Sequence, residues 1–369
     1  MIKFFRKIRQ RLLTENKFGK YLLYAIGEII LVVIGIMIAL QVNNWNQTRK
    51  QLDNEVQLYS KLYNDLNSEY LNIDTEFQQF SAYSKFFSHV YNETKGEAEY
   101  NHQLQYNFFL WFHRHKMYIK EKYSEELTSI TNDNINQRLK SFISKEMDAN
   151  DAIDLWNEYQ RKEVRPYLNR HGINKTKAMF STELDGFGNA VSYIDFIEYS
   201  KLKEQYGSLE FDQLLFNIQF QTNWAIQNII WLNETNLRFQ DALKKELELH
   251  GVTENIIYWE NKKKHIHLIN EADEFYETKE YQKSANKYEE AFKLVEYVSE
   301  NDRYNAACSF ALAENIESAF NQLFIIANDP YKFKDYNWIT QDSDLEILHK
   351  DQRWNEIIAI VKLNKEEKE

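Results

Sequence analysis

The chain has 369 residues with only 9 Gly and 2 Pro, which excludes collagen-like, Pro-rich and turn-rich all-β proteins. A single Cys excludes an intrachain disulfide, and a net charge of −11 is opposite to what a general nucleic-acid binder needs, so we expect no nucleic-acid partner. Apolar residues at 43% and aromatic residues at 15% supply enough material for packed cores.

A basic leader opens the chain over residues 1–20. Its basic side chains are Lys3, Arg6, Lys7, Arg9, Arg11, Lys17 and Lys20, and Glu15 is its only acid. Because the cytoplasmic flanks of membrane helices carry an excess of Lys and Arg, the leader predicts a cytoplasmic N-terminus and an extracytoplasmic body. Apolar residues between the bases would also let the leader lie on anionic lipid as an amphipathic helix, but we favour a role as topology signal alone.

An apolar run follows the leader, and we assign a transmembrane helix to residues 21–42. As a helix, residues 21–40 reach about 30 Å, which matches the hydrocarbon core of a bilayer. Glu28 is the only charged residue in that run, and insertion of the many Leu, Ile and Val residues outweighs its cost. A cleaved signal peptide, the alternative, has a shorter apolar run and a small-residue cleavage site. We therefore expect an uncleaved, single-pass anchor.

One stripe of this helix predicts a contact with a second helix. At 100° per residue the stripe comprises Tyr24, Glu28, Val32, Gly35 and Ala39. Gly35 and Ala39 form a small-x-x-x-small pair that permits close approach of a second helix, and Glu28 in lipid is costly unless it has a partner. We predict self-association or pairing through this stripe. The alternative is that small residues are simply common in membrane helices and that Glu28 is tolerated.

A family resemblance lies in the opening of the chain, MIKFFRKIRQRLLTENKFGKYLLYAIGEIILVVIGIMIALQVNNWN. This opening closely resembles the N-terminal signature of an uncharacterised family of Bacteroidota membrane proteins, over residues 1–50. The resemblance implies an envelope protein of a Gram-negative bacterium, with the anchor in the inner membrane and the bulk of the chain in the periplasm. It implies no established activity and no catalytic residues.

Residues 45–255 predict an extracytoplasmic bundle built on two long, heptad-patterned helices. The first apolar seam comprises Leu52, Val56, Tyr59, Tyr63, Leu66, Tyr70, Ile73, Phe77 and Phe80. The second seam comprises Phe211, Leu215, Ile218, Thr222, Ala225, Ile229, Leu232, Asn236, Phe239 and Leu243. Each seam pairs either with its copy in a coiled-coil dimer or with the other seam inside one bundle. We favour the bundle, because bulky Tyr and Phe fit poorly into the holes of a two-stranded coil.

No motif for catalysis, metal binding or a cofactor stands out, so we expect no enzymatic activity, no metal and no cofactor. The pairs His113–His115 and His265–His267 lie in sequence that reads as helical, where residues two apart point away from each other. The Gly-x-Gly within residues 182–192 lacks the third glycine and the preceding strand of a nucleotide-binding loop. We interpret that stretch as a crossover between bundle helices.

Residues 256–365 predict a helical repeat module with a terminal cap. Small and large residues recur at an offset of 35 residues: Ala272, Phe275, Ser284 and Tyr288 are matched by Ala307, Phe310, Ala319 and Leu323. The pattern resembles the tetratricopeptide repeat, in which small residues lie where two helices cross. The segment after Pro330 resembles the cap of such arrays, and we expect the helix preceding Ile266 to dock at the other end. We interpret Cys308 as a buried filler rather than a nucleophile.

The predicted architecture is all-α, with one N-terminal transmembrane helix, a helical bundle and a C-terminal tetratricopeptide-like module. Because such modules bind proteins on a concave helical surface, we expect a membrane-anchored scaffold or adaptor with a protein partner. The alternative is a single-pass sensor in which a ligand shifts the long helices and the stripe around Glu28. A third option, an extracytoplasmic hydrolase, requires a pocket with convergent polar groups.

Overall fold

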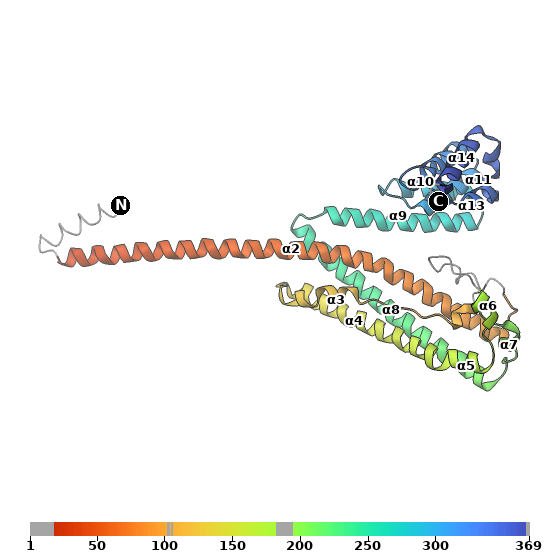
Figure 1. Cartoon of the computed structure of the whole chain (residues 1–369). Coiled ribbons are helices and arrows are strands. Elements are labelled where there is room, and N and C mark those ends of the chain that lie inside the picture. The colour runs from red at the N-terminus through yellow and green to blue at the C-terminus, as the bar shows by residue number, and fades with distance from the viewer. Residues whose placement is uncertain (1–17, 102–103, 105, 182–194, 367–369) are drawn as a thin grey trace. The chain divides into compact units, whose positions relative to one another are not determined.

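The computed structural model describes residues 18–101, 104, 106–181 and 195–366 (Figure 1). Helices make up 81% of the structure, and the described residues form no β-strand, only one isolated bridge between Asn174 and Ile197. The all-α prediction is confirmed. Two compact units divide the chain, one ending at Gly251 and the other beginning at Val252. Most of the predicted leader and the whole predicted crossover at 182–192 lie outside the described residues.

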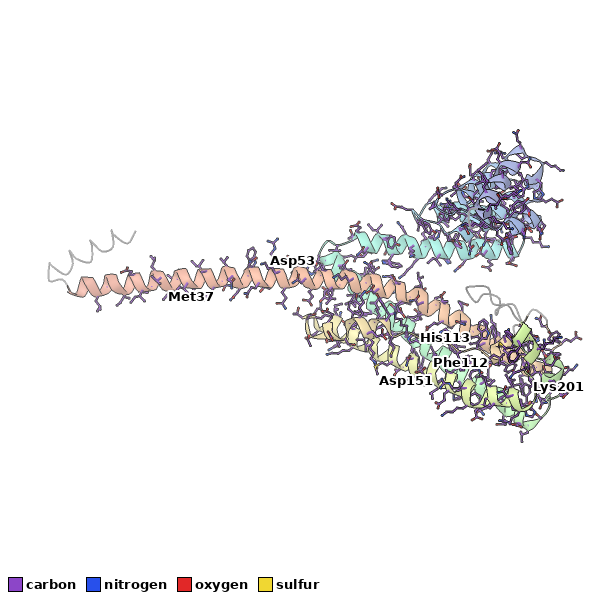
Figure 2. All side chains as sticks on the ribbon, in the orientation of Figure 1. Met37, Asp53, Phe112, His113, Asp151 and Lys201 are labelled. Carbon is purple, nitrogen blue, oxygen red and sulfur yellow. The ribbon has the colours of Figure 1, made fainter. Side chains whose placement is uncertain are left out.

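Helix α2 (Phe18–Lys95) dominates the first unit and is about 120 Å long (Figure 1). Its side chains from residue 29 to residue 54 are all exposed, a stretch that includes Met37 and Asp53, labelled in Figure 2. Within the described residues, α2 alone has a segment long and apolar enough to cross a membrane, and none of that segment is buried. Since nothing in the described part of the chain covers this apolar surface, the segment is consistent with membrane anchoring.

The remainder of α2 packs in a bundle with α8 (Leu209–Leu249), which also packs against α4 (Asp133–Tyr159). Helix α8 runs antiparallel to α2, because Lys95 pairs with Asp212 while Asn236 donates to the carbonyl of Leu66. Shorter elements complete the first unit: η1 (Tyr106–Phe109), α3 (Tyr118–Tyr123), η2 (Glu125–Thr128), η3 (Gln160–Val164), α5 (Arg165–Arg170), α6 (Thr176–Ser181) and α7 (Tyr199–Lys203).

The two predicted seams form the interior of this bundle. Every residue of the second seam, from Phe211 to Leu243, is buried on α8. In the first seam Tyr59, Tyr63, Leu66, Ile73 and Phe80 are buried, Val56, Tyr70 and Phe77 are half-buried, and Leu52 is exposed. Because α2 and α8 pack together in one chain, the seams meet each other, as the bundle interpretation predicts.

Aromatic side chains fill the middle of the bundle. Trp156 on α4 is fully buried, stacks on Tyr83 at 5.2 Å and meets Phe80 edge-on at 5.4 Å. Its indole Nε1 donates to the hydroxyl of Thr222 on α8 at 3.0 Å. This one side chain therefore connects α4 with both long helices.

The second unit is a series of helical hairpins. Its elements are α9 (Glu254–Glu277), α10 (Tyr281–Phe292), α11 (Glu300–Leu312), α12 (Ile316–Ala327), α13 (Tyr336–Gln341), η5 (Ser343–Lys350) and α14 (Gln352–Glu366). Helix α10 packs against α9 and α11, α11 packs against α12 and η5, and α14 packs against α12. Together these helices enclose one apolar core.

The two hairpin turns have the same backbone conformation at positions 35 residues apart. Lys279 and Glu314 stand 35 residues apart, and both have positive φ, at 63° and 58°. One residue later, the N–H groups of Glu280 and Asn315 donate to the carbonyls of Phe275 and Phe310, each at 2.8 Å. This pairing is a common way to close a helix C-terminus. The two hairpins therefore turn in the same way.

One expectation about the repeats is wrong. We expected the helix preceding Ile266 to dock at the other end of the repeats. Instead, α9 runs without a break from Glu254 to Glu277, so that segment is the first half of a repeat helix. The physical reason is that no Gly or Pro occurs in this range to end a helix.

Candidate functional site

A groove of about 660 Å³ lies on the second unit. Its walls come from α9, α11, α13 and η5, with one side chain from α10. Tyrosines and carboxylates dominate the lining, and a tryptophan, Trp338, stands at its edge with 61% of its surface exposed. These groups come from two hairpins and the cap, so they meet only because the hairpins stack.

Three tyrosine–aspartate pairs connect the walls of the groove. Tyr276 on α9 donates to Asp344 in η5, and Tyr288 on α10 donates to Asp273 on α9. Tyr304 on α11 donates to Asp342 Oδ2 at 2.7 Å. Burial raises the pKa of each tyrosine above its usual range, and the neighbouring carboxylate raises it further. The three hydroxyls are therefore protonated donors at neutral pH.

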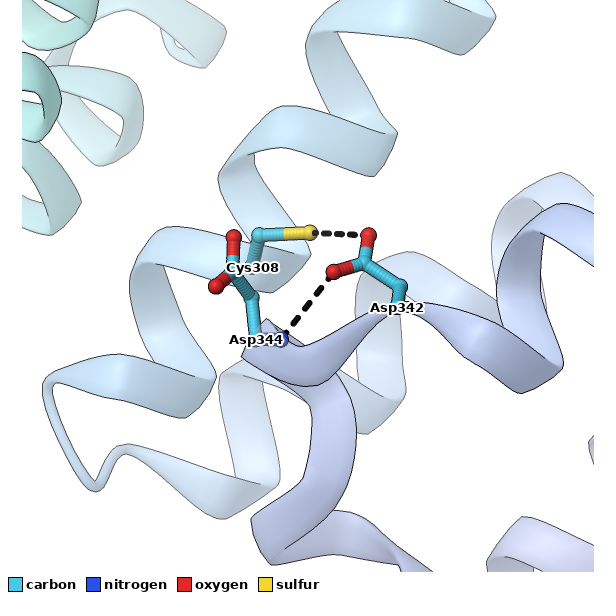
Figure 3. A group of neighbouring side chains, drawn as sticks. All are labelled: Cys308, Asp342 and Asp344. Carbon is cyan, nitrogen blue, oxygen red and sulfur yellow. Dashed lines mark hydrogen bonds between the residues drawn. The ribbon is translucent and has the colours of Figure 1, made fainter.

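Asp342 is held in place on several sides (Figure 3). Its Oδ1 accepts the backbone N–H of Asp344 at 3.0 Å, which caps η5. The thiol of Cys308 points at Oδ2 across 3.7 Å, as Figure 3 shows. A carboxylate with this many donors has a defined orientation toward the groove.

Negative charge in the groove is not balanced by the protein. The lining includes Asp273, Glu277, Asp342 and Asp344 but no Lys, Arg or His. Within the described part of the chain, none of these four carboxylates forms an ion pair. Burial and the nearby charges of Asp302 and Glu277 raise the pKa of Asp273 despite its hydrogen bond from Tyr288. The groove is therefore an acidic and aromatic surface.

Cys308, Asp342 and Asp344 come closest to a metal site. Their ligand atoms lie within 4.8 Å of one another, the one such group that the described residues provide. However, burial and the two carboxylates raise the pKa of the Cys308 thiol well above its usual range. A thiol binds metal as the thiolate, so a cation would have to displace the proton of Cys308 to bind here. The residue is 4% exposed, in keeping with the predicted filler.

The predicted repeat-defining residues lie in the core beneath the groove. Ala272, Ala307 and Ala319 are fully buried where helices cross, and Phe310, Tyr288 and Leu323 pack around them. Ser284 is also fully buried and its hydroxyl lies 2.9 Å from that of Ser309. Phe275 is half-buried, beneath the ammonium of Lys283. Of this set only Tyr288 also lines the groove.

The predicted stripe on the membrane segment is exposed in the single chain. Val32, Gly35 and Ala39 are exposed on α2, and Glu28 is half-buried. A side chain placed on Gly35 would meet no atom within 4 Å. The Tyr24 side chain lies outside the described residues. Pairing through this stripe stays a prediction, because it concerns a second helix.

The prediction that His113 and His115 lie on a helix is wrong. These residues lie in an irregular stretch, 111–117, between η1 and α3, rather than on a helix (Figure 2). Both rings reach the same carboxylate: Glu76 on α2 lies 2.9 Å from His115 Nδ1 and 3.5 Å from His113 Nε2. By contrast, His265 and His267 do lie on a helix, where the first is buried and the second exposed.

Around Glu76 the bundle encloses a group of buried ionisable side chains. Burial would raise the pKa of Glu76, but the two histidines, with His115 hydrogen-bonded to its carboxylate, outweigh burial and lower it. Burial of His115 is likewise outweighed by Glu76, so the pKa of His115 is raised. Glu146 accepts the N–H groups of Ile119 and Lys120 at the start of α3. Burial nevertheless raises the pKa of Glu146 to about 7.

These shifts predict that the bundle loses stability as the pH rises from about 4.5 to about 7, between the ordinary and the folded-state pKa of Glu146, and that the loss continues above pH 6.5 as His115 deprotonates. Glu146 and His115 both bind protons more tightly in the folded state, so the folded chain loses stabilisation as each deprotonates. We expect a decrease of about 3 kcal/mol in the free energy of unfolding, measured by urea denaturation at several pH values. The variant Glu146→Gln should show a shallower decrease. An equal slope in both proteins would contradict this assignment.

Sequence reasoning missed the groove, although one signal for it was present. Asp273 and Cys308 directly follow the small residues Ala272 and Ala307, so they occupy equivalent places in the two repeats, and both line the groove. The offset of 35 residues therefore pointed to one face of the unit. It did not point to the cap residues, whose distance from α9 depends on the fold.

Comparison with known proteins adds one match. Residues 28–97 match the model of a family of unknown function, DUF6090. The match spans most of α2, including most of its apolar segment and the part that packs in the bundle, but none of the groove. No curated protein and no solved structure is significantly similar to the chain. Fold and match together indicate an all-helical protein, consistent with membrane anchoring, of unknown function.

Proposed function

We propose that this protein is a membrane-anchored scaffold or adaptor whose second unit binds another protein in its groove. The observation that carries the proposal is the groove itself, where side chains of two hairpins and the cap converge on one accessible surface. Helical repeats use surfaces of this kind to bind peptides and domains. The tetratricopeptide-like character of the repeats is part of the proposal, and the matching turns at Lys279 and Glu314 support it.

The proposal places the anchor in the inner membrane of a Gram-negative cell, the N-terminus in the cytoplasm and both units in the periplasm. The exposed apolar part of α2 supports the anchor. The basic residues of the leader support the orientation, because positive flanks stay in the cytoplasm.

The chemistry of the groove supports binding rather than catalysis. Its tyrosine hydroxyls donate to aspartates, and its single thiol is held protonated by burial and negative charge. A nucleophile needs a neighbouring base or a lowered pKa to react, and no histidine or lysine lines the groove. We therefore propose that the protein has no enzymatic activity of its own.

A sensor function is the second candidate, and the continuity of α2 favours it. The same uninterrupted helix contains the membrane segment and one wall of the bundle. A ligand that rearranged the bundle would therefore act directly on the stripe around Gly35. The scaffold requires an occupant of the groove, whereas the sensor requires a ligand-dependent change in the contacts of α2.

Site-specific photocrosslinking in intact cells tests the scaffold. A photoreactive amino acid at Trp338 should give one or a few crosslinked products of defined mass, because this side chain stands at the groove. The matched control is the same amino acid at Ile347, which is 48% exposed in η5 but does not line the groove. Equal patterns at both positions, or none at Trp338, would refute partner binding in the groove. Protease protection of tags at the two chain ends checks the orientation.

A further inference from the structure

We propose that the groove binds an arginine side chain presented by an exposed segment of the partner protein. This inference rests on the proposed function and states what the groove recognises. The guanidinium would lie against Tyr276 or Trp338 and pair with Asp342 and Asp344, all of which line the groove.

Charge is the first argument for a cationic occupant. Four carboxylates line the groove, no basic side chain accompanies them, and no ion pair within the described residues neutralises them. Elsewhere the unit pairs its acids readily: Arg353 contacts both Glu317 and Asp351, and Lys287 contacts Glu271. The groove thus concentrates uncompensated negative charge in one concavity, which attracts a positive ligand.

Unused hydrogen-bond acceptors are the second argument. Tyr276 occupies Oδ2 of Asp344, and Tyr288 occupies Oδ1 of Asp273. Among the described residues, nothing donates to the second oxygen of either carboxylate, nor to the carboxylate of Glu277. The tyrosine and backbone donors already hold these carboxylates in one orientation. A cationic ligand would therefore lose little binding free energy to ordering the carboxylates.

Aromatic rings are the third argument, and they favour arginine over lysine. Tyr304 and Trp338 lie with ring centroids 6.5 Å apart and planes at 60°, beside the carboxylate of Asp342. A planar guanidinium stacks on an exposed ring such as that of Trp338 while its forked donors bind carboxylates, which a compact ammonium does less well. The same unit shows this geometry internally, where Arg353 lies 4.2 Å from the ring of Phe320 and pairs with Glu317.

Size argues for a protein segment rather than a small amine. About 660 Å³ is much more than one guanidinium fills. A stretch of main chain with an arginine and its neighbours would occupy the groove and remove Trp338 from water. A free polyamine has the charge but neither the planar head group nor the bulk.

Binding of a defined peptide to the full-length protein in lipid nanodiscs tests the inference. The probe is a fluorescent nine-residue Gly-Ser peptide with one central arginine, followed by fluorescence anisotropy. We expect the arginine peptide to bind at least tenfold more tightly than its glutamine or glutamate counterparts, and more tightly than the lysine version. Affinity should fall as salt is raised, and a tenfold excess of spermidine over peptide should not displace the arginine peptide. Equal binding of arginine and glutamine peptides, or displacement by spermidine, would overturn the proposal.

Isosteric variants link the binding to the groove. Asp342→Asn with Asp344→Asn removes two charges, while asparagine still caps η5 at position 342, and should weaken the arginine peptide at least tenfold. The control Glu346→Gln removes an exposed charge from the same helix outside the groove and should change affinity less than twofold. An unchanged melting profile shows that the double variant folds. If it binds the peptide as well as wild type, the inference fails.

Crosslinking at Trp338 distinguishes failure of arginine recognition from failure of the scaffold proposal. A partner that crosslinks at Trp338 equally well in the double Asn variant leaves the scaffold intact and refutes arginine recognition. Absence of any crosslinked partner at Trp338 refutes the scaffold, and with it this inference.

Discussion

The variant Trp156→Ala is expected to lower the free energy of unfolding of the bundle by about 4 kcal/mol. Trp156 is fully buried between Phe80 and Tyr83, so its removal leaves a large cavity lined by rings on α2. The change also removes the hydrogen bond to Thr222, a buried polar link from α4 to α8.

Hydrogen exchange of the full-length protein measures this effect, because it reports on α8 separately from the second unit. In Trp156→Ala the slowest amides of α8 should exchange faster by roughly a factor of a thousand, the kinetic equivalent of about 4 kcal/mol. The neighbouring Leu155→Ala is the matched control, since Leu155 is 47% exposed on the same helix. Equal protection of α8 in the two variants would show that Trp156 does not hold the bundle together.

The variant Ala307→Phe is expected to unfold the second unit while leaving the bundle and membrane insertion unchanged. Ala307 is fully buried in α11, which packs against α10, α12 and η5. A benzyl group has no space there, and overpacking of this kind costs about 3 kcal/mol or more. Because α11 carries Tyr304 and Cys308, the groove would be lost with it.

Limited proteolysis checks this prediction, with crosslinking at Trp338 as a second readout. Ala307→Phe should expose cleavage sites after Val252 and abolish the crosslinked partner, while the fragment ending near Gly251 stays resistant in the membrane fraction. Asn301→Phe places the same ring on the exposed side of α11 and should behave as wild type. Proteolysis that spreads through both units would contradict the independence of the two units.

Periodicity predicted most of the helical architecture. Every residue of the seam from Phe211 to Leu243 is buried on α8, because one stripe of a long helix faces the core and shows as a periodic pattern in the sequence. The buried face is wider than the seam and also includes Leu214, Asn228, Gln240, Ala242 and Leu247. The matched pairs at an offset of 35 residues, such as Ala272 with Ala307, likewise mark the helix crossings of the second unit. In these elements burial follows directly from local spacing.

Irregular segments and contacts between distant residues escaped prediction. The rings of His113 and His115 share Glu76 because the chain between η1 and α3 is irregular, which no helical periodicity reveals. The groove depends on Tyr276 reaching Asp344 and Tyr304 reaching Asp342, pairs separated by 68 and 38 residues. Nothing local to those residues indicates their partner.

The amino-acid sequence by itself determined the apolar span, the helical class and the buried faces, because each depends on side chains within a few turns of one helix. Only the tertiary structure decided that α9, α11 and the cap bring their tyrosines and aspartates to one surface with no basic residue among them. The physical reason is that stacking of whole hairpins sets which distant side chains meet, and the free energy of that stacking comes from the alanines and rings beneath the groove rather than from the polar groups that line it.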